Sequence, residues 1–495
     1  MGAGASASTP CNPTEPMRIA IFSYEYPPET GFGGIGTYSY YQSRALVKLG
    51  HDVHVFAGST ENGLTHTERD GLKITRIKRE GWFHGSLEGM RGRRAWWAEN
   101  RLNTGFGAFE AFRHVHDKNP FDFIEAPECG ADSMMTSTLL QVPTAIKFHS
   151  PARLIMNIYD TPRIDREACA FVEQLGINQA EVLTSCSRFL ADEVATKMNE
   201  PKPIHVIQNG IDLEMFDHDD GIDVYEKFGL PKNKKLIFFA NRMEERKGVH
   251  ILQEMVQQTL AEYPDIAFVF GGRDLFGYME KRLLPWVKES GLEDRFFYLG
   301  QLDLSSVRAC LKAASVFLIP SLWENCPYSC IEAMTAGRAI VSSDCGGMPE
   351  LIVDRQTGLL AKNGDPDSFV AALKEMIEDD QLAERCGAAA RAEVEKRLTD
   401  VHIGQQSIDV YQGFLDGNPP AVESQADRVA RAAVAASAEG ASVAEVAELR
   451  QRIAKLTGEL DTAKRREEEL KISREFRWGR KILSVVTLGA SRSRG

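Results

Sequence analysis

Residues 18–24 read RIAIFSY, and residues 31–36 read GFGGIG. The first segment is a short apolar run with the length of a buried strand, and residues 37–49 behind the glycines have the apolar spacing of a helix. Glycines in such a turn either let a ligand approach the free N–H groups of the helix N-terminus or only make the turn flexible. The stretch predicts a strand, a glycine-rich turn and a helix, which is the opening unit of a parallel α/β sheet.

The same alternation of short apolar runs with longer helical patterns continues along most of the chain, which indicates parallel sheets covered by helices on both faces. A first series of further strands is expected at residues 53–57, 73–77, 121–125, 144–148, 182–185 and 205–207. A second series is expected at residues 236–240, 266–270, 296–299, 316–319 and 339–342. Between them the pattern pauses at Asn209-Gly210-Ile211-Asp212 and at the acidic stretch up to Gly221. The sequence therefore predicts two doubly wound, Rossmann-like α/β domains that face each other across a cleft.

The division of the chain follows from these patterns and from the breaks between them. Two helical segments are expected between Pro366 and Leu415, and Gly417-Asn418-Pro419-Pro420 then ends the regular pattern. The predicted parts are a tail at 1–16, domains at 17–208 and 209–398, a helix at 399–416, a linker at 417–440, a coiled coil at 441–473 and a basic amphipathic tail at 474–495.

The C-terminal extension carries two further patterns. Apolar residues spaced as in a heptad seam are Val446, Leu449, Ile453, Leu456, Leu460, Ala463 and Leu470. A coiled coil of this kind would join two copies of the chain or bind a different partner. Residues 471–495 hold seven Lys and Arg against one Glu among apolar residues. This pattern favours peripheral contact with an anionic membrane, and a merely soluble tail is the alternative.

The composition excludes several classes of protein. The chain has 495 residues, of which 43% are hydrophobic and 26% charged, as is typical of soluble globular domains. Its 58 Lys and Arg against 70 Asp and Glu give a net charge of −12, so nucleic-acid binding is not expected. The nine cysteines are scattered without a C-x-x-C pair, and there is no apolar stretch of about eighteen residues. We therefore expect a cytoplasmic protein without membrane spans.

A charged segment follows the first strand of the second series. Residues 241–248 read NRMEERKG, which places Arg242 and Lys247 where a strand ends and a helix begins. Two cations at such a position could neutralise a diphosphate without a metal, and a solvated run of surface charge is the alternative.

Residues 320–334 read PSLWENCPYSCIEAM and carry two carboxylates eight positions apart. Glu324 is expected in the loop after a strand and Glu332 inside the next helix, with Pro327 suited to its first turn. At a helical rise of 1.5 Å per residue the two carboxylates are roughly 12 Å apart. Since this is too far for a glycosidase pair acting on one bond, we expect them to contact different ends of a ligand. The helix start would offer N–H groups to phosphate, Glu332 would accept from ribose hydroxyls and Glu324 would face a reacting sugar.

Four elements in this order carry a resemblance to a known family. They are Gly33-Gly34-Ile35-Gly36, the pair Arg242 and Lys247, the E-x7-E spacing of Glu324 and Glu332, and Gly346-Gly347-Met348-Pro349-Glu350. Together they resemble the retaining GT-B glycosyltransferases of glycosyltransferase family 4, also described as glycosyl transferases group 1, over about residues 17–415. The resemblance implies the GT-B fold, in which residues 209–212 connect the domains and the helix at 399–416 crosses back to the first domain.

The resemblance also implies roles for individual residues. Arg242 and Lys247 would bind the donor diphosphate, and Gly33 and Gly34 would lie near the phosphate and the acceptor. Further contacts with the donor would come from Asn325, Cys326, Pro327, Tyr328, Ser329 and, at the ribose, Glu332. The residues implied to act at the transferred sugar are Glu324, beside the anomeric carbon, and His149, after the strand at 144–148.

The family's chemistry implies that the leaving phosphate helps to deprotonate the acceptor hydroxyl while cations stabilise the growing charge. Arg242 and Lys247 would supply this charge, so neither a metal nor another cofactor is expected to be required. Asp217-His218-Asp219 has the spacing of a metal-binding D-x-D, but its place in an expected linker favours solvated surface.

The sequence thus predicts an enzyme that moves a sugar from a nucleotide sugar to a glycan or lipid-linked acceptor in polysaccharide or glycoconjugate biosynthesis, at the inner face of the cytoplasmic membrane. Residues 80–103, with Trp82, Trp96 and Trp97, are expected either to form an acceptor-binding loop or to pack in the fold. Two other hypotheses stay open, namely a nucleotide-sugar epimerase of the same architecture and a non-catalytic scaffold that acts through the coiled coil.

Overall fold

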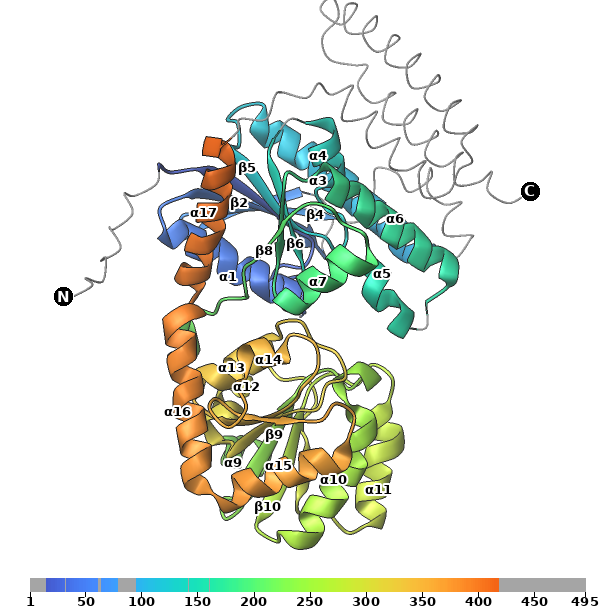
Figure 1. Ribbon diagram of the computed structural model, residues 1–495, viewed down its shortest axis with the longest axis vertical. Helices are drawn as coiled ribbons and strands as arrows, with labels where there is room; N and C mark the ends of the chain where they lie inside the picture. Colours follow the sequence, from blue (N-terminus) through green and yellow to red (C-terminus); the bar gives the residue numbers. More distant parts are fainter. Residues whose placement is uncertain are drawn as a thin grey trace, which may run out of the picture.

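The computed structural model describes residues 15–31, 33–60, 64–78, 95–140, 142–159 and 161–417. This part of the chain forms two lobes, each built on one sheet (Figure 1). The N-terminal lobe consists of the sheet of strands β1 to β8 with the helices that pack on it. The C-terminal lobe consists of the sheet of strands β9 to β14 with its own helices. The prediction of two doubly wound α/β domains is confirmed.

The N-terminal lobe has a sheet with the strand order β3-β4-β2-β1-β5-β6-β7-β8. The bounds are β1 Arg18–Ser23, β2 Asp52–Ser59, β3 Leu64–Arg69, β4 Leu72–Lys78, β5 Phe123–Pro127, β6 Thr144–Phe148, β7 Val182–Ser185 and β8 Ile204–Val206. Every strand expected from the sequence in this half is present. The additional strand, β3, pairs antiparallel with β4 at the sheet edge. Its sequence LTHTER is polar and mostly exposed, so it lacks the apolar run by which the others were predicted.

Helices cover both faces of this sheet (Figure 1). Their bounds are α1 Gly34–Lys48, α3 Trp96–His116, α4 Met134–Leu139, α5 Ala152–Ile155, η1 Met156–Ile158, α6 Arg163–Gln179 and α7 Arg188–Lys197. Between sheet and helices lies an aromatic core in which the ring of Phe22 stacks on Phe56 at 5.2 Å and lies 5.4 Å from Phe112. This core fixes β1 and β2 and therefore the loops at their carboxyl ends.

The C-terminal lobe has a six-stranded sheet with the order β11-β10-β9-β12-β13-β14, in which all neighbours are parallel. The strand bounds are β9 Lys235–Ala240, β10 Ile266–Gly271, β11 Phe296–Tyr298, β12 Val316–Ile319, β13 Ala339–Ser343 and β14 Leu359–Ala361. All five expected strands are present. The sixth, β14, has only three residues, which is too short for a clear sequence signal.

The helical elements of this lobe are α8 Leu213–Asp217, α9 Val224–Phe228, η2 Glu245–Lys247, α10 Val249–Glu262, η3 Met279–Leu283, α11 Leu284–Glu289, α12 Leu304–Ala313, α13 Tyr328–Thr335 and α14 Met348–Leu351. Three helices then follow where the sequence predicted two, namely α15 Pro366–Glu378, α16 Asp380–Arg397 and α17 Asp400–Gly417. The side chain of Asp379 accepts a hydrogen bond from the N–H of Leu382 at 2.9 Å and begins α16 as a new helix.

Helix α17 returns from the C-terminal lobe and lies against the N-terminal lobe (Figure 1). A Cβ atom added to Gly404 would lie 3.1 Å from Cβ of Ala45 on α1, so a glycine permits this close packing. The buried ring of Tyr411 stacks on Phe123 at 4.4 Å, and its hydroxyl donates to Glu125 at 2.8 Å. The last described helix is therefore part of the core of the first lobe.

Two chain segments connect the lobes and pair with each other. The N–H of Ile211 donates to the carbonyl of Leu398, and the N–H of Asp400 donates to the carbonyl of Ile211, both at 2.9 Å. Lys48 of α1 binds the carboxylates of both Asp212 and Asp400 at 2.7 Å. We call residues 207–212 the crossing segment.

Several sequence predictions lie outside the described residues. These are the N-terminal tail up to residue 14, Trp82, the linker after 417, the coiled coil and the basic tail. Among the helices that the structure describes, none is long and apolar enough to cross a bilayer.

Candidate functional site

Five charged residues alternate in sign along two loops of the C-terminal lobe. Nη2 of Arg242 lies 3.3 Å from Oε1 of Glu244, and Nη2 of Arg246 lies 3.0 Å from the same oxygen. Nη1 of Arg246 lies 3.4 Å from Oε2 of Glu324, and Nζ of Lys247 donates to the other oxygen of Glu324. We call these five residues the charge series. It joins the two cations and one of the two carboxylates that the sequence singled out.

The sheet brings these residues together because β9 and β12 are neighbours and the loops at their carboxyl ends meet. The carbonyl of Arg246 accepts a hydrogen bond from the N–H of Leu322 at 2.8 Å. Gly248 has φ +79°, and a Cβ atom there would lie 1.9 Å from the carbonyl oxygen of Pro320, so only glycine fits. The turn of η2 is thereby pressed against the segment that carries Glu324.

The Gly346-Gly347 pair holds the same segment from the other side. A Cβ atom on Gly346 would lie 2.0 Å from the carbonyl oxygen of Glu324, and one on Gly347 would lie 1.9 Å from that of Asn325. The N–H of Gly347 donates to the carbonyl of Glu324 at 2.9 Å. Close backbone contact is therefore the physical reason for glycine in this motif.

Two buried members of the series, Glu324 and Lys247, remain charged at neutral pH. The side chain of Arg242 is 45% exposed, whereas those of Glu244, Arg246, Lys247 and Glu324 are all below 10%. Burial would raise the pKa of Glu324, but Lys247 and Arg246 outweigh it, so the pKa is lowered and the carboxylate is ionised at neutral pH. Burial lowers the pKa of Lys247 to about 8, although Glu324 opposes the shift. Lys247 is therefore mainly protonated at pH 7.

Glu332 lies on α13, while Glu324 precedes this helix. Pro327 is the N-cap residue and the helix begins at Tyr328, so the separation of roughly 12 Å expected from helical rise does not apply to the pair. Glu332 is half-buried. Burial raises its pKa to about 7, partly opposed by Arg308. Its carboxyl group has no hydrogen bond with another described residue and can therefore meet a ligand hydroxyl.

The residues between Glu324 and Glu332 contact the N-terminal lobe and the crossing segment. Nδ2 of Asn325 donates to the carbonyl of His149 at 2.5 Å. The carbonyl of Cys326 accepts from Nδ2 of Asn209 at 2.8 Å, and the hydroxyl of Tyr328 donates to the carbonyl of Gly210 at 3.1 Å. Ser329 instead faces its own lobe, where its Oγ lies 3.4 Å from Nδ2 of Asn241. Their implied role in donor binding stays a prediction.

His149 lies at the carboxyl end of β6, opposite Asn325. Its backbone N–H donates to Glu128 at 3.0 Å, and its ring lies 4.9 Å from that of Tyr38. Burial, assisted by Lys147, lowers the pKa of His149 well below its ordinary value, so the imidazole is neutral. Nε2 is buried and has no hydrogen-bond partner among the described residues. A neutral imidazole with a free nitrogen can bind a sugar hydroxyl.

The glycine-rich turn leads into α1, with Gly33 as its N-cap residue. A Cβ atom on Gly33 would lie 2.9 Å from Oε2 of Glu25, whereas one on Gly34 would meet nothing within 4 Å. The helix N-terminus at Gly34 is therefore open to a ligand, with the carboxylate of Glu25 close by.

The segment Asp217-His218-Asp219 is exposed, as expected of solvated surface. Both oxygens of Asp217 also bind the guanidinium of Arg391 at 2.7 Å, which was not predicted. The sequence missed this pair since 174 residues separate its members. No cluster of His, Cys, Asp and Glu that could hold a metal occurs in the part of the chain described.

Trp96 and Trp97 begin α3 with about half of their surface exposed, so neither is packed in the core.

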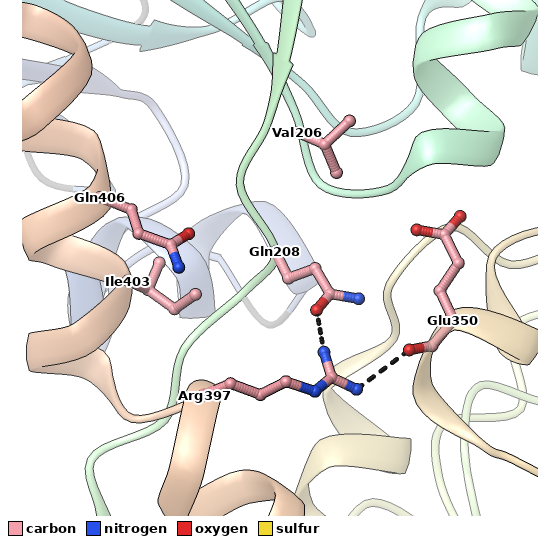
Figure 2. A pocket seen from close by; sticks show the side chains of 6 residues that line it. All are labelled: Val206, Gln208, Glu350, Arg397, Ile403 and Gln406. Atoms are coloured by element: carbon pink, nitrogen blue, oxygen red, sulfur yellow. Dashed lines mark hydrogen bonds between the residues drawn. The ribbon is translucent and has the colours of Figure 1, made fainter. Parts of the chain in front are cut away.

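A pocket of about 330 Å³ lies beside the crossing segment (Figure 2). It is lined by Val206, Gln208, Glu350, Arg397, Ile403 and Gln406, none of which was predicted as a site residue. Arg397 donates to the side chain of Gln208 and, at 3.0 Å, to the carbonyl of Glu350. The carboxylate of Glu350 accepts the N–H groups of Arg188 and Phe189 at 2.8 Å, which caps α7 from the other lobe.

Models of known protein families match both lobes of the chain. The model described as Glycosyltransferase Family 4 matches residues 32–215, and the model described as Glycosyl transferases group 1 matches residues 223–393. The chain is 26% identical over 414 residues to alpha-maltose-1-phosphate synthase of Mycolicibacterium smegmatis, with 80% of this chain and 99% of the relative covered.

Solved structures of other proteins share this fold. Sucrose-phosphate synthase from Thermosynechococcus elongatus is similar with a TM-score of 0.68 and 20% identity, over 81% of this chain and 100% of that chain. The catalytic domain of starch synthase IV from Arabidopsis thaliana, bound to ADP and acarbose, is similar with a TM-score of 0.65 and 16% identity, again over 81% and 100%. The two lobes therefore match known structures as one unit.

Proposed function

Because this chain belongs to the GT-B glycosyltransferases of family 4, we propose that it transfers a sugar, with retention of configuration, from a nucleotide diphosphate donor to a hydroxyl group of a glycan or lipid-linked acceptor. The observation that carries the proposal is the charge series, in which Glu324 stays ionised between Arg246 and Lys247. An ionised carboxylate beside several cations can hold a sugar hydroxyl while the cations hold the phosphates.

Arg242 and Lys247 are proposed to bind the diphosphate. The half-exposed guanidinium of Arg242 contacts Glu244 at 3.3 Å and can turn towards a ligand. The ammonium of Lys247 has three donors, so it can share its charge between Glu324 and a phosphate. Glu332, whose carboxyl group has no hydrogen-bond partner among the described residues, is proposed to bind the ribose. The ADP bound by the similar starch synthase supports a donor of this class.

Retention without a covalent intermediate is supported by the surroundings of Glu324. Two cations on one carboxylate make it a weak nucleophile, which disfavours attack on the anomeric carbon. In the proposed reaction the bond between the anomeric carbon and the diphosphate oxygen breaks. The acceptor oxygen bonds to that carbon from the same face, and the acceptor proton moves to the leaving phosphate oxygen. Glu324 and the neutral imidazole of His149 would orient the sugar.

The first experiment is thermal unfolding of the full-length protein with ADP, UDP and GDP and with their glucose conjugates. A ligand at 100 times its Kd stabilises the folded state by about 2.7 kcal/mol. We expect the nucleotides of one base to stabilise the wild type. This stabilisation should be lost in the double variant Arg242→Ala, Lys247→Ala. A wild type that no nucleotide stabilises, and that consumes no nucleotide sugar, would overturn the proposal and favour a scaffold.

The products distinguish transfer from epimerisation. With the donor found in the screen, we expect the protein to form a glycoside with the same anomeric configuration as the donor, visible by NMR. Free epimerised nucleotide sugar in the absence of an acceptor would indicate an epimerase instead. An inverted anomeric centre would retain the transferase but refute the retaining mechanism.

Contact with a membrane is proposed from the composition of residues 471–495 alone. Removal of residues 474–495 is expected to shift the protein away from vesicles that contain anionic lipid, while transfer to a soluble acceptor persists. Unchanged partitioning would contradict this part of the proposal without affecting the chemistry.

A further inference from the structure

Arg246 is a cation of the charge series to which the proposed function assigns no contact with the donor. Its guanidinium is 8% exposed and lies 3.0 Å from Oε1 of Glu244 and 3.4 Å from Oε2 of Glu324. It also donates to the carbonyl of Trp323 at 3.0 Å, and its own carbonyl accepts from Leu322 at 2.8 Å. Side chain and backbone of one residue therefore hold three consecutive residues that end at Glu324.

The groups around Arg246 come from both lobes. Those with ionisable side chains are Arg242, Glu244 and Lys247 on its own loop, Glu324 on the loop after β12, and Tyr159 of the N-terminal lobe. Burial alone would lower the pKa of Arg246, but Glu324, Tyr159 and Glu244 outweigh it, and the guanidinium stays charged. The thiols of Cys330 and Cys345 near Glu324 have pKa values raised by burial and are neutral.

A bound diphosphate would change this balance. Its negative charge would attract Lys247, so Glu324 would lose part of the charge that keeps it ionised. The diphosphate would not draw Arg246 away from Glu324 in the same way, because the guanidinium of Arg246 is buried and already bonded to Glu244, Trp323 and Glu324. Nη1 of the guanidinium contacts Trp323 and Glu324 while Nη2 contacts Glu244, whereas a lysine would have one nitrogen in place of these two.

We infer that Arg246 is a positioning residue, which holds Glu324 ionised and in place while Arg242 and Lys247 neutralise the donor diphosphate. This inference rests on the proposed function, since it requires a bound diphosphate. It predicts that loss of Arg246 affects the ionisation and position of Glu324 mainly when nucleotide is bound. In the free protein Lys247 alone can pair with Glu324.

The test measures proton uptake on nucleotide binding. Full-length wild type, Arg246→Met and Arg246→Lys are titrated with ADP and with UDP by calorimetry at pH 6.5, in two buffers of different ionisation enthalpy. We expect Arg246→Met to take up as much as one additional proton per nucleotide, because Glu324 becomes protonated. Arg246→Lys keeps the charge and is expected to match the wild type. Glu332, with a pKa of about 7, titrates in all three proteins and cancels in the difference.

A kinetic readout separates positioning from binding. In Arg246→Met we expect kcat to fall by about 10- to 100-fold, as for a misplaced reacting group, with the donor KM little changed. The acid limb of its kcat profile is expected to move up to about pH 6.5 or above, where Glu324 takes up its proton, since Glu324 loses a neighbouring cation. Arg246→Lys is expected to retain the acid limb of the wild type but to have a reduced kcat, because a single nitrogen cannot occupy the positions of both Nη1 and Nη2.

Each outcome decides the inference. Wild-type proton uptake and an unshifted acid limb in Arg246→Met would overturn it, and so would complete loss of nucleotide binding in a folded variant, which would make Arg246 a phosphate ligand. If Arg246→Met does not fold, wild-type kcat in Arg246→Lys overturns the inference, and reduced kcat with unchanged proton uptake supports it. A wild type that binds no nucleotide would instead refute the proposed function, before any variant is compared.

Discussion

Each lobe has a buried glutamate near the interface between the lobes, and the pKa values of these two glutamates are shifted in opposite directions. Glu324 in the C-terminal lobe is paired with Lys247 and Arg246, and its pKa is lowered although burial opposes this. Glu128 in the N-terminal lobe has no ion pair with another described residue and accepts the N–H groups of His149 at 3.0 Å and Ser150 at 2.5 Å. Burial, assisted by Glu173, raises its pKa to about 8. The glutamate of the C-terminal lobe keeps its charge beside two cations, and the glutamate of the N-terminal lobe fixes the backbone around a neutral imidazole.

Two buried lysines show the same contrast. Burial lowers the pKa of both Lys147 and Lys247 to about 8. Lys247 binds a carboxylate that a ligand can replace, whereas Lys147 donates to the carbonyls of Ile207 at 2.8 Å and Gln208 at 3.3 Å in the crossing segment. Since Gln208 also accepts a hydrogen bond from Arg397, both lobes hold the crossing segment (Figure 2). A similar pKa thus accompanies a proposed ligand-binding role for Lys247 and a structural role for Lys147.

The largest effect is expected from Lys247→Ala. It removes the buried cation proposed to bind the diphosphate, so we expect kcat/KM for the nucleotide sugar to fall by about 10³-fold, a loss of about 4 kcal/mol of transition-state stabilisation. Steady-state kinetics on the full-length protein measure this. The matched control is Lys362→Ala, whose side chain is 76% exposed and which should keep wild-type activity. Equal activity of the two variants would contradict the role proposed for Lys247 and, with it, the contrast between Lys247 and Lys147.

A smaller effect is expected from His149→Ala. Loss of the imidazole would remove a hydrogen bond to the sugar, so we expect kcat to fall by about 30-fold or 2 kcal/mol. Because the pKa of His149 lies well below its ordinary value, the imidazole is neutral throughout the range from pH 6 to 8, and the shape of the kcat profile there should match the wild type. If the kcat profile of the variant instead lacked a pH-dependent limb that the wild type shows, His149 would titrate in this range. The neutral state assigned to its imidazole would then be wrong.

Glu128→Gln tests whether this lobe fixes backbone geometry. A glutamine accepts only one of the two N–H groups well, so we expect a reduction in kcat of about tenfold with little change in nucleotide affinity. In the wild type the folded pKa of about 8 lies above the ordinary 4.5. The folded state therefore binds the additional proton between these values, and the unfolding free energy falls as the pH rises from 4.5 to 8. Denaturant titrations at pH 5, 6.5 and 8 should show a smaller decline in the variant, and an equal decline would contradict the raised pKa.

The sequence predicted the parts of this arrangement that depend on nearby residues. Apolar runs located the strands, and the order of strands and loops placed Arg242, Lys247 and Glu324 at one edge of a sheet. It could not pair Arg246 with Glu324, 78 positions away, because their contact depends on β9 lying next to β12. Glu128 was missed for another reason. A glutamate after a strand is usually exposed, and only the fold shows that it is buried under the backbone of His149.

The smallest effect is expected from Asp217→Asn, which tests whether charge outside both sides of the interface matters. The Asp217 side chain is 50% exposed, so loss of its pair with Arg391 should lower the unfolding free energy by only about 0.5 kcal/mol. The hydrogen bonds from Arg391 lower the pKa of Asp217. The stabilisation is therefore present above the ordinary value of 3.8 and is lost as the pH falls through the lower pKa of the folded protein, below which wild type and variant should converge in stability. Activity should equal that of Asp219→Asn with or without added Mg²⁺ or Mn²⁺. A metal-dependent loss in Asp217→Asn alone would show that the D-x-D segment binds a cation, and the pairing with Arg391 would then be only one of its states.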